Sequence, residues 1–132
     1  MPHQIFLSYQ SASRAKVDVV RNALERQGFT CWHDHQRLQE GDDWNGVIES
    51  ALRSSAMMIL FLTERCETSG PVKHELMTAL DARVPIVPVR LEEYLPTSHP
   101  LDALKQWIYF DAFNKDKDSR DSEHPGEALL PK

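Results

Sequence analysis

Long apolar runs are missing from this chain of 132 residues. None reaches the roughly 20 residues that a membrane-spanning helix requires. Met1 to Gln4 lead directly into a strand-like run, with no basic and apolar signal segment before it. We therefore expect a soluble, cytoplasmic protein that makes no membrane contact.

Cysteine is scarce, and basic residues are outnumbered by acidic ones. Cys31 and Cys66 lack the spacing of metal ligands, and without a secretion signal we expect both to be reduced packing residues. The chain has 15 Lys and Arg against 20 Asp and Glu, a formal charge of −5. No cluster of basic residues with interleaved aromatics is present, so direct nucleic-acid binding is not expected.

Several catalytic and phosphate-binding motifs are absent. The first predicted loop, residues 9–13, has no glycine, which argues against a Walker loop and against a GxGxxG dinucleotide fingerprint. There is no GxSxG elbow and no HExxH helix. His33 and His35 flank Asp34, but alternate residues of an irregular loop diverge and no third ligand is placed, so we predict no metal site.

Apolar periodicity predicts five strands and three main helices. Helical spacing of apolar residues follows the first three strands, and Gly28 is predicted to close the first helix. Pro85 and Pro88 would remove ladder hydrogen bonds from a central strand, so we place their strand toward one side of the sheet. Only one short helix is expected in 91–103. The predicted strands are 5–9, 29–32, 56–62, 84–89 and 107–110.

Strands that are continuously apolar and alternate with helices indicate a parallel sheet covered on both faces. The predicted fold is therefore α/β, a flavodoxin-like three-layer sandwich with a five-stranded parallel sheet. We assign residues 1–114 to this single domain. Residues 115–132 are too polar to bury and are predicted to be a tail, or a linker toward a fused or associated sensor domain.

The third helix carries the most informative residue of the chain. Pro71 at a first helical position, with Ser69 or Gly70 as the cap, fixes where this helix begins. Glu75 falls beside the apolar stripe that Val72 and Leu76 define. Its carboxylate is either a solvated charge on the flank of the helix, as most acidic residues are, or one arm of a pocket.

Topology favours a pocket at the end of the sheet toward which Glu75 is directed. In a sheet of this kind, ligands bind outside the carboxyl ends of the strands, where the strand order reverses. With flavodoxin-like order this crevice lies between the first and third strands. The loops that open there begin at Ser8 and Tyr9 and at Thr63 and Glu64, and the second loop leads into the helix of Glu75.

Five motifs in order resemble a Toll/interleukin-1 receptor (TIR) domain of the bacterial type. They are IFLSY, GFTCWHD, LxxGDDW, an apolar strand ending FLT, and SxxxxxEL followed by PIVPV, and together they span about residues 4–112. The resemblance implies the flavodoxin-like sheet. It also implies one of two activities, because TIR domains either recruit one another or cleave the nicotinamide glycosidic bond of NAD.

By this resemblance Glu75 is the catalytic residue, because it matches the glutamate of the SxWxxxE motif and Ser69 matches its serine. Pro71 stands where the motif often has tryptophan, so Trp32 or Trp44 would supply an aromatic wall. Ser8 and Tyr9 fall where the family lines its pocket. Asp34 and Arg37 fall in the BB loop, which corresponds to residues 33–43 and would contact other TIR copies. NAD would be the substrate, with no cofactor.

Each of these residues also has a structural interpretation. Trp32 and Trp44 could be core residues, Ser8 could form a hydrogen bond within a turn, Tyr9 could be a packed ring, and Asp34 and Arg37 could form a solvated pair.

The leading hypothesis for the function is an NAD-cleaving effector module of a bacterial defence or signalling protein. The alternatives are a non-catalytic assembly module and a phosphoacceptor receiver, which the apolar end of the third strand disfavours. The residues do not decide whether the product is ADP-ribose or a cyclic isomer.

Overall fold

The computed structural model describes residues 4–32, 44–106 and 110–113 of the chain. In these ranges three α-helices and three short 3-10 helices, η1, η3 and η4, alternate with five strands. The helices are α1 (Arg14–Arg26), α2 (Trp44–Arg53), α3 (Gly70–Asp81), η1 (Ser11–Ser13), η3 (Glu64–Thr68) and η4 (Leu101–Gln106). The strands are β1 (Gln4–Ser8), β2 (Thr30–Trp32), β3 (Met57–Leu62), β4 (Ile86–Arg90) and β5 (Phe110–Asp111).

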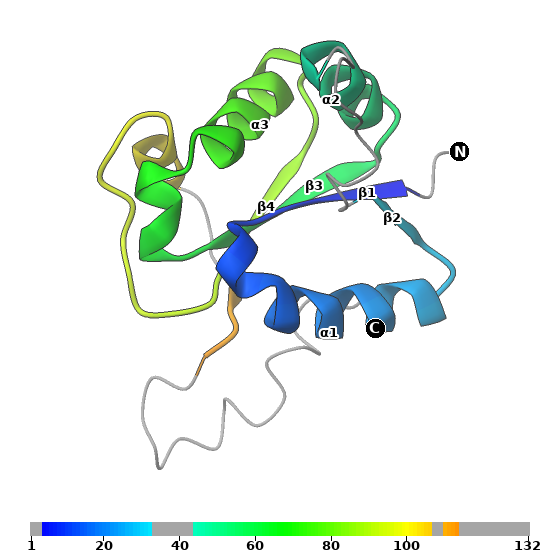
Figure 1. Cartoon of the computed structure of the whole chain (residues 1–132), viewed down its shortest axis with the longest axis horizontal. Coiled ribbons are helices and arrows are strands. Elements are labelled where there is room, and N and C mark those ends of the chain that lie inside the picture. The colour runs from blue at the N-terminus through cyan, green and yellow to red at the C-terminus, as the bar shows by residue number, and fades with distance from the viewer. Residues whose placement is uncertain (1–3, 33–43, 107–109, 114–132) are drawn as a thin grey trace.

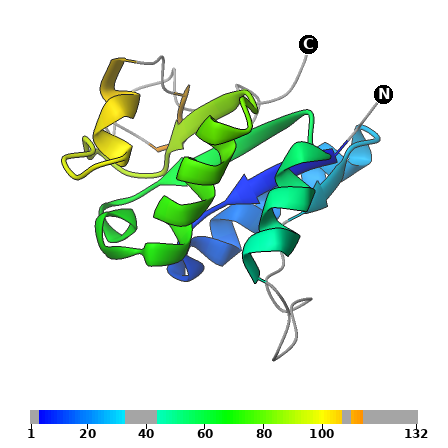
Figure 2. The same cartoon turned by 90° about the horizontal axis from the view of Figure 1, so that it is seen from above.

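All five strands are parallel and lie in the order β2-β1-β3-β4-β5. Helix α1 covers one face of the sheet, and α2 and α3 cover the other (Figure 1). In the perpendicular view of Figure 2, α2 and α3 lie side by side across the sheet. The predicted flavodoxin-like three-layer sandwich is confirmed. The order reverses between β1 and β3, which places the predicted crevice at their carboxyl ends.

Strand parity divides the apolar residues between two cores. Alternate residues of a strand point to opposite faces of the sheet. In β1, the side chain of Phe6 therefore packs on the side of α2 and α3, and those of Ile5 and Leu7 pack on the side of α1. Strand β3 divides in the same way, with Leu60 on the first face and Phe61 on the second. Both Cys31 and Cys66 are buried in these cores and neither forms a disulfide, as predicted.

Strand β4 lies second from one edge of the sheet, as its prolines predicted. Its pairing with β5 begins at Val89, one residue beyond Pro88, so in the described pairing the missing proline N–H costs no ladder bond to that neighbour. Arg90 fixes β5 through two hydrogen bonds to the Asp111 carboxylate, of 2.6 and 2.9 Å. Of the predicted strand 107–110, residues 107–109 lie outside the described residues.

The long connection after β4 holds one short helix, η4, as expected. It begins at Leu101, within the predicted segment, and ends at Gln106, beyond it. Leu101 and Leu104 are buried in the core under α3. No helix in the described ranges is both long and apolar enough to cross a membrane.

Helices α1 and α3 end with the same backbone motif but with different residues. After α1, the N–H of Phe29 bonds the carbonyl of Leu24, and Gly28 has φ +95°. After α3, the N–H of Val84 bonds the carbonyl of Ala79, and Arg83 has φ +57°. Both ends are Schellman motifs, in which glycine adopts the left-handed conformation without the steric cost that a Cβ imposes.

We therefore predict opposite effects for exchanges at the two motifs. Gly28→Ala should lower the free energy of unfolding by about 1 kcal/mol, and Arg83→Gly should raise it by about 0.5–1 kcal/mol. A Cβ at Gly28 would meet no atom within 4 Å, so the loss would report backbone strain alone. Urea unfolding curves measure both changes. Equal effects of the same sign would contradict the assignment of the two motifs.

Candidate functional site

A buried carboxylate meets a buried hydroxyl at the carboxyl end of β1. Glu75 of α3 is 0% exposed, and its Oε1 accepts a hydrogen bond of 2.7 Å from the Oγ of Ser8, which is also 0% exposed. The two residues are 67 positions apart in the sequence. The structure therefore brings the predicted catalytic residue and one predicted pocket residue into direct contact at the reversal of strand order.

Local sequence explains why Glu75 points inward. The Ser69 hydroxyl caps α3 by accepting the N–H of Val72 at 3.3 Å, and Pro71 follows in the first turn. From this start, helical spacing places Glu75 on the buried side together with Val72, Leu76 and Ala79. The interpretation of Glu75 as a solvated flank charge is wrong. A carboxylate in an apolar core is costly unless it is hydrogen-bonded, and Ser8 supplies such a bond.

The loop between β3 and α3 begins at the same end of the sheet as Ser8. Thr63, directly after β3, is buried, and its Oγ1 lies 3.7 Å from the Sγ of Cys66. The thiol also donates to the carbonyl of Phe61 at 3.4 Å. Burial raises the pKa of the Cys66 thiol, with hydrogen bonds from Thr63 acting in the opposite direction. The thiol therefore stays protonated and serves packing, in agreement with the sequence interpretation.

Hydrogen bonds to the Glu67 carboxylate link the same loop to the connection that follows β4. Its carboxylate accepts hydrogen bonds from the hydroxyl of Tyr94, from the N–H and hydroxyl of Thr97 at 3.1 and 2.5 Å, and from the N–H of Ser98 at 2.9 Å. Partial burial raises the pKa of Glu67, but these donors outweigh burial and lower it to about 2. Glu67 therefore holds the start of α3, and with it Glu75, against the rest of the fold.

The other predicted site residues lie in different surroundings. Tyr9 packs against the core on the α1 side, as its structural interpretation suggested, and Ser69 is the α3 cap. Trp44 is the first residue of α2, but its side chain is outside the described part, and Asp34 and Arg37 are outside the described residues altogether. Their roles in substrate binding stay predictions.

The described ranges hold no group of three or more His, Cys, Asp or Glu that could bind a metal ion.

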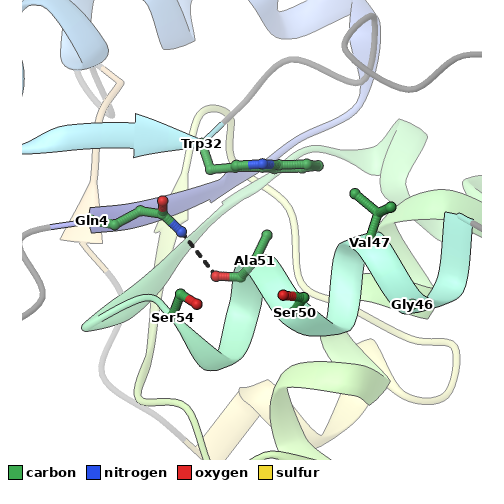
Figure 3. Close-up of a pocket in the computed structure, with 7 residues that line it drawn as sticks. All are labelled: Gln4, Trp32, Gly46, Val47, Ser50, Ala51 and Ser54. Atoms are coloured by element: carbon green, nitrogen blue, oxygen red, sulfur yellow. Dashed lines mark hydrogen bonds between the residues drawn. The ribbon is translucent and has the colours of Figure 1, made fainter.

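Trp32 lies on the same face of the sheet as Glu75 but at the β2 edge. Its ring stacks on Phe6, with centroids 4.8 Å apart and planes inclined by 15°. It also lines a cavity of about 440 Å³ against α2, together with Gln4, Ser50 and Ser54 (Figure 3). The sequence interpretation missed these three polar residues. Gln4, Phe6 and Ser8 are alternate residues of β1 and share one face of the sheet. This spacing could have indicated that a polar side chain lies at each end of β1 on the face that Phe6 occupies.

The strand order defines a doubly wound α/β domain, and the candidate site of Ser8 and Glu75 lies at its β1/β3 reversal. A profile of the TIR domain matches residues 5–127, nearly the whole chain, and the chain belongs to this family. TIR domains self-associate and act in signalling and immune assemblies. A comparison with curated proteins finds no match.

Solved structures agree with the family at the level of fold. The TIR domain of a Toll-related receptor from Hydra magnipapillata has a TM-score of 0.66 and 19% identity, covering 81% of this chain and 82% of the other. The TIR domains of the activated Roq1 resistosome, which recognises the pathogen effector XopQ, have a TM-score of 0.59 and 22% identity. The match covers 67% of this chain and 57% of the other. A TIR-STING receptor from C. gigas has a TM-score of 0.65 and 22% identity, and the match covers 97% of this chain and 40% of the receptor chain. The chain thus spans little more than half of the Roq1 chain and less than half of the receptor.

The Glu67 contacts predict a pH-dependent contribution to stability. Because the folded pKa of about 2 lies below the ordinary value of 4.5, this contribution is complete above about pH 4.5 and is lost as the pH falls toward 2. Glu67→Gln should lower the free energy of unfolding at pH 7 by about 1–2 kcal/mol, after allowance for solvent screening. At pH 3 the difference from wild type should be smaller. Urea unfolding at both pH values tests this, with Glu93→Gln, an exposed carboxylate, as the control. A pH-independent difference would contradict it.

Proposed function

We propose that this TIR domain cleaves NAD at the bond between the nicotinamide ring and the ribose, with Glu75 as the catalytic residue. The observation that carries the proposal is the carboxylate buried at the β1/β3 reversal and oriented by the Ser8 hydroxyl. The family supports it as well, because enzymatic TIR domains use the glutamate that Glu75 matches. NAD is the substrate in this proposal, and no cofactor is required.

The chemistry needs only one carboxylate. As the bond between C1′ and the ring nitrogen breaks, its electron pair neutralises the positive charge of the nicotinamide, so no acid has to protonate the leaving group. Positive charge develops on the ribose, as in other glycosidic cleavages. A carboxylate beside the sugar stabilises this charge and can accept hydrogen bonds from the ribose hydroxyls. Water then bonds C1′ and loses a proton to solvent, or a nucleophile of the same nucleotide forms a cyclic product.

The surroundings of Glu75 suit electrostatic stabilisation. An apolar environment strengthens the attraction between a carboxylate and a developing cation, compared with the same pair in water. Val72, Leu76 and Ala79 provide such an environment around Glu75. The Ser8 hydroxyl donates one hydrogen bond that fixes the carboxylate, and carboxylate oxygens accept more than one, so a ribose hydroxyl could be added to this contact.

A non-catalytic assembly module is the second candidate, and two observations favour it. Pro71 replaces the aromatic residue of the family motif, and Glu75 is fully buried, so a ribose must displace neighbouring groups to reach it. In this case the Ser8–Glu75 contact would only stabilise the packing of α3 on β1. Incubation of concentrated protein with NAD, followed by chromatography for nicotinamide, distinguishes the two candidates.

The decisive variant is Glu75→Gln. Glutamine keeps the size of the side chain and an oxygen that accepts from Ser8, but it lacks the negative charge. We predict that it lowers the rate of nicotinamide release by about 100-fold or more. The fold should persist with a small change in unfolding free energy. Glu75→Ala is a poorer test, since it would leave the buried Ser8 hydroxyl without this acceptor.

Two controls accompany this measurement. Glu93→Gln removes an exposed carboxylate outside the site and should leave turnover unchanged. Ser8→Ala should reduce turnover less than Glu75→Gln, because the charge remains while its orientation is relaxed. Full activity of Glu75→Gln would refute the assignment of Glu75.

We also propose that activity requires assembly with other copies of the domain. Residues 33–43 form a long connection by the standard of two to six residues between strand and helix. They carry Asp34 and Arg37 among mixed charges that suit contact with a neighbouring copy, and in the family this loop contacts an adjacent TIR domain. Contact energy from a neighbour would select the active conformation of the site.

This proposal predicts that specific activity rises with protein concentration or crowding. Arg37→Glu should suppress the rise by reversing one charge of the contact, while circular dichroism and the unfolding curve stay as in wild type. Lys16→Glu makes the same charge change on the outer surface of α1 and is the matched control. A flat specific activity from dilute to concentrated protein, with a fully active Arg37→Glu variant, would show that one monomer holds a complete site.

A further inference from the structure

The cavity between the β2 edge and α2 has an aromatic wall and polar groups that converge on it. Its volume of about 440 Å³ falls within the range of small-molecule sites, roughly 300–1,000 Å³. Ser8 and Glu75 are not among its lining residues. It is therefore a separate feature of the α2 and α3 face from the site proposed for NAD cleavage.

The aromatic wall is the indole ring of Trp32. Phe6 stacks on this ring at 4.8 Å and so holds its orientation before any ligand binds. In Figure 3 the indole extends above one side of α2, from which Val47 and Ala51 project beneath it. The lining residue Gly46 has no side chain that could occupy the space. A fixed aromatic face above small apolar groups is suited to a flat ring, because planar ligands gain most from stacking.

The polar groups specify which kind of ring fits. The Gln4 side chain donates through Nε2 to the carbonyl of Ala51 at 2.9 Å and to Oγ of Ser55 at 2.8 Å, and these two bonds fix its amide orientation. Its oxygen then points away from α2, on the side of Trp32 (Figure 3). This acceptor, fixed at the cavity, requires a donor on the ligand.

Two hydroxyl groups complete the set. Ser50 lies on α2 and Ser54 directly follows its last residue, with the Ser54 N–H donating to the Ser50 carbonyl at 3.1 Å. Both residues line the cavity, and their side chains make no hydrogen bond within the described part of the chain. A hydroxyl can donate to a ring nitrogen. No lysine or arginine is among the lining residues, so the lining offers no cationic side chain to a phosphate.

We propose that this cavity binds an aminopurine base of the adenine type. The base would stack on Trp32, its exocyclic amino group would donate to Oε1 of Gln4, and its ring nitrogens would accept from Ser50 and Ser54. Because no lining side chain is cationic, a nucleoside and its phosphate esters would bind through the base alone and with similar affinity. This site is independent of NAD cleavage, since adenosine has no nicotinamide bond.

The test is titration of the full chain with adenosine, followed by the indole N–H signals in ¹H–¹⁵N NMR spectra. The chain has three tryptophans, and Trp32→Phe identifies the signal of Trp32. We expect this signal to shift with saturation, and AMP to give a similar dissociation constant. Inosine, which has a carbonyl in place of the amino group, should bind at least about tenfold more weakly. Equal binding of inosine and adenosine would refute the role of Gln4.

Variants of lining and distant residues test whether adenosine binds in this cavity. Ser50→Leu should fill the cavity and raise the dissociation constant for adenosine at least about tenfold, whereas Lys16→Leu, on the exposed surface of α1, should leave it unchanged. Glu75→Gln should also bind adenosine as wild type does, which separates this proposal from the proposed catalysis. No shift of the Trp32 signal at millimolar adenosine, or unchanged binding by a folded Ser50→Leu variant, would overturn the proposal.

Discussion

The hydrogen bond between Ser8 and Glu75 is the contact on which this interpretation of the domain depends. It joins the end of the first strand to the third helix, at the point where the strand order reverses, and both partners are fully buried. A carboxylate in an apolar core is unfavourable unless it is well bonded, so its presence demands an explanation. Catalysis supplies one explanation, because the same environment that makes the charge costly also makes it effective toward a cationic transition state.

Much of the molecule around this contact fixes where α3 begins. Ser69 caps the helix, and Glu67 binds the preceding loop to the connection after β4 through four hydrogen bonds. A shift of the helix start by one residue would rotate Glu75 by about 100° and move it off the buried side. Contacts that are remote from any reacting atom therefore determine the position of the carboxylate.

The fold could be predicted from the sequence because its signals are local and periodic. Apolar runs predicted the strands, and capping residues and glycines such as Gly28 predicted where helices begin and end. The two prolines of β4 predicted its position near an edge of the sheet. The position of Glu75 was harder to predict, since periodicity placed it beside the apolar stripe without deciding between solvent and core. Only the packing of α3 on β1 decides this, through a partner 67 residues away. The cavity at Trp32 was missed for the same reason, because its lining comes from β1, β2, α2 and Ser54, the residue after α2. Asp34 and Arg37 lie outside the described residues, so their predicted roles remain untested.

Under the proposed mechanism, the Glu75 carboxylate contacts the ribose of NAD. The most direct measurement is ¹³C NMR of protein labelled at the glutamate carboxyl carbons, with Glu75→Gln identifying the Glu75 signal. The protein is titrated with a carbocyclic NAD analogue whose nicotinamide bond cannot be cleaved. We expect the Glu75 signal to shift with saturation, because the ribose hydroxyls would donate to the carboxylate together with Ser8. An unchanged Glu75 signal, while amide signals elsewhere show that the analogue is bound, would contradict it.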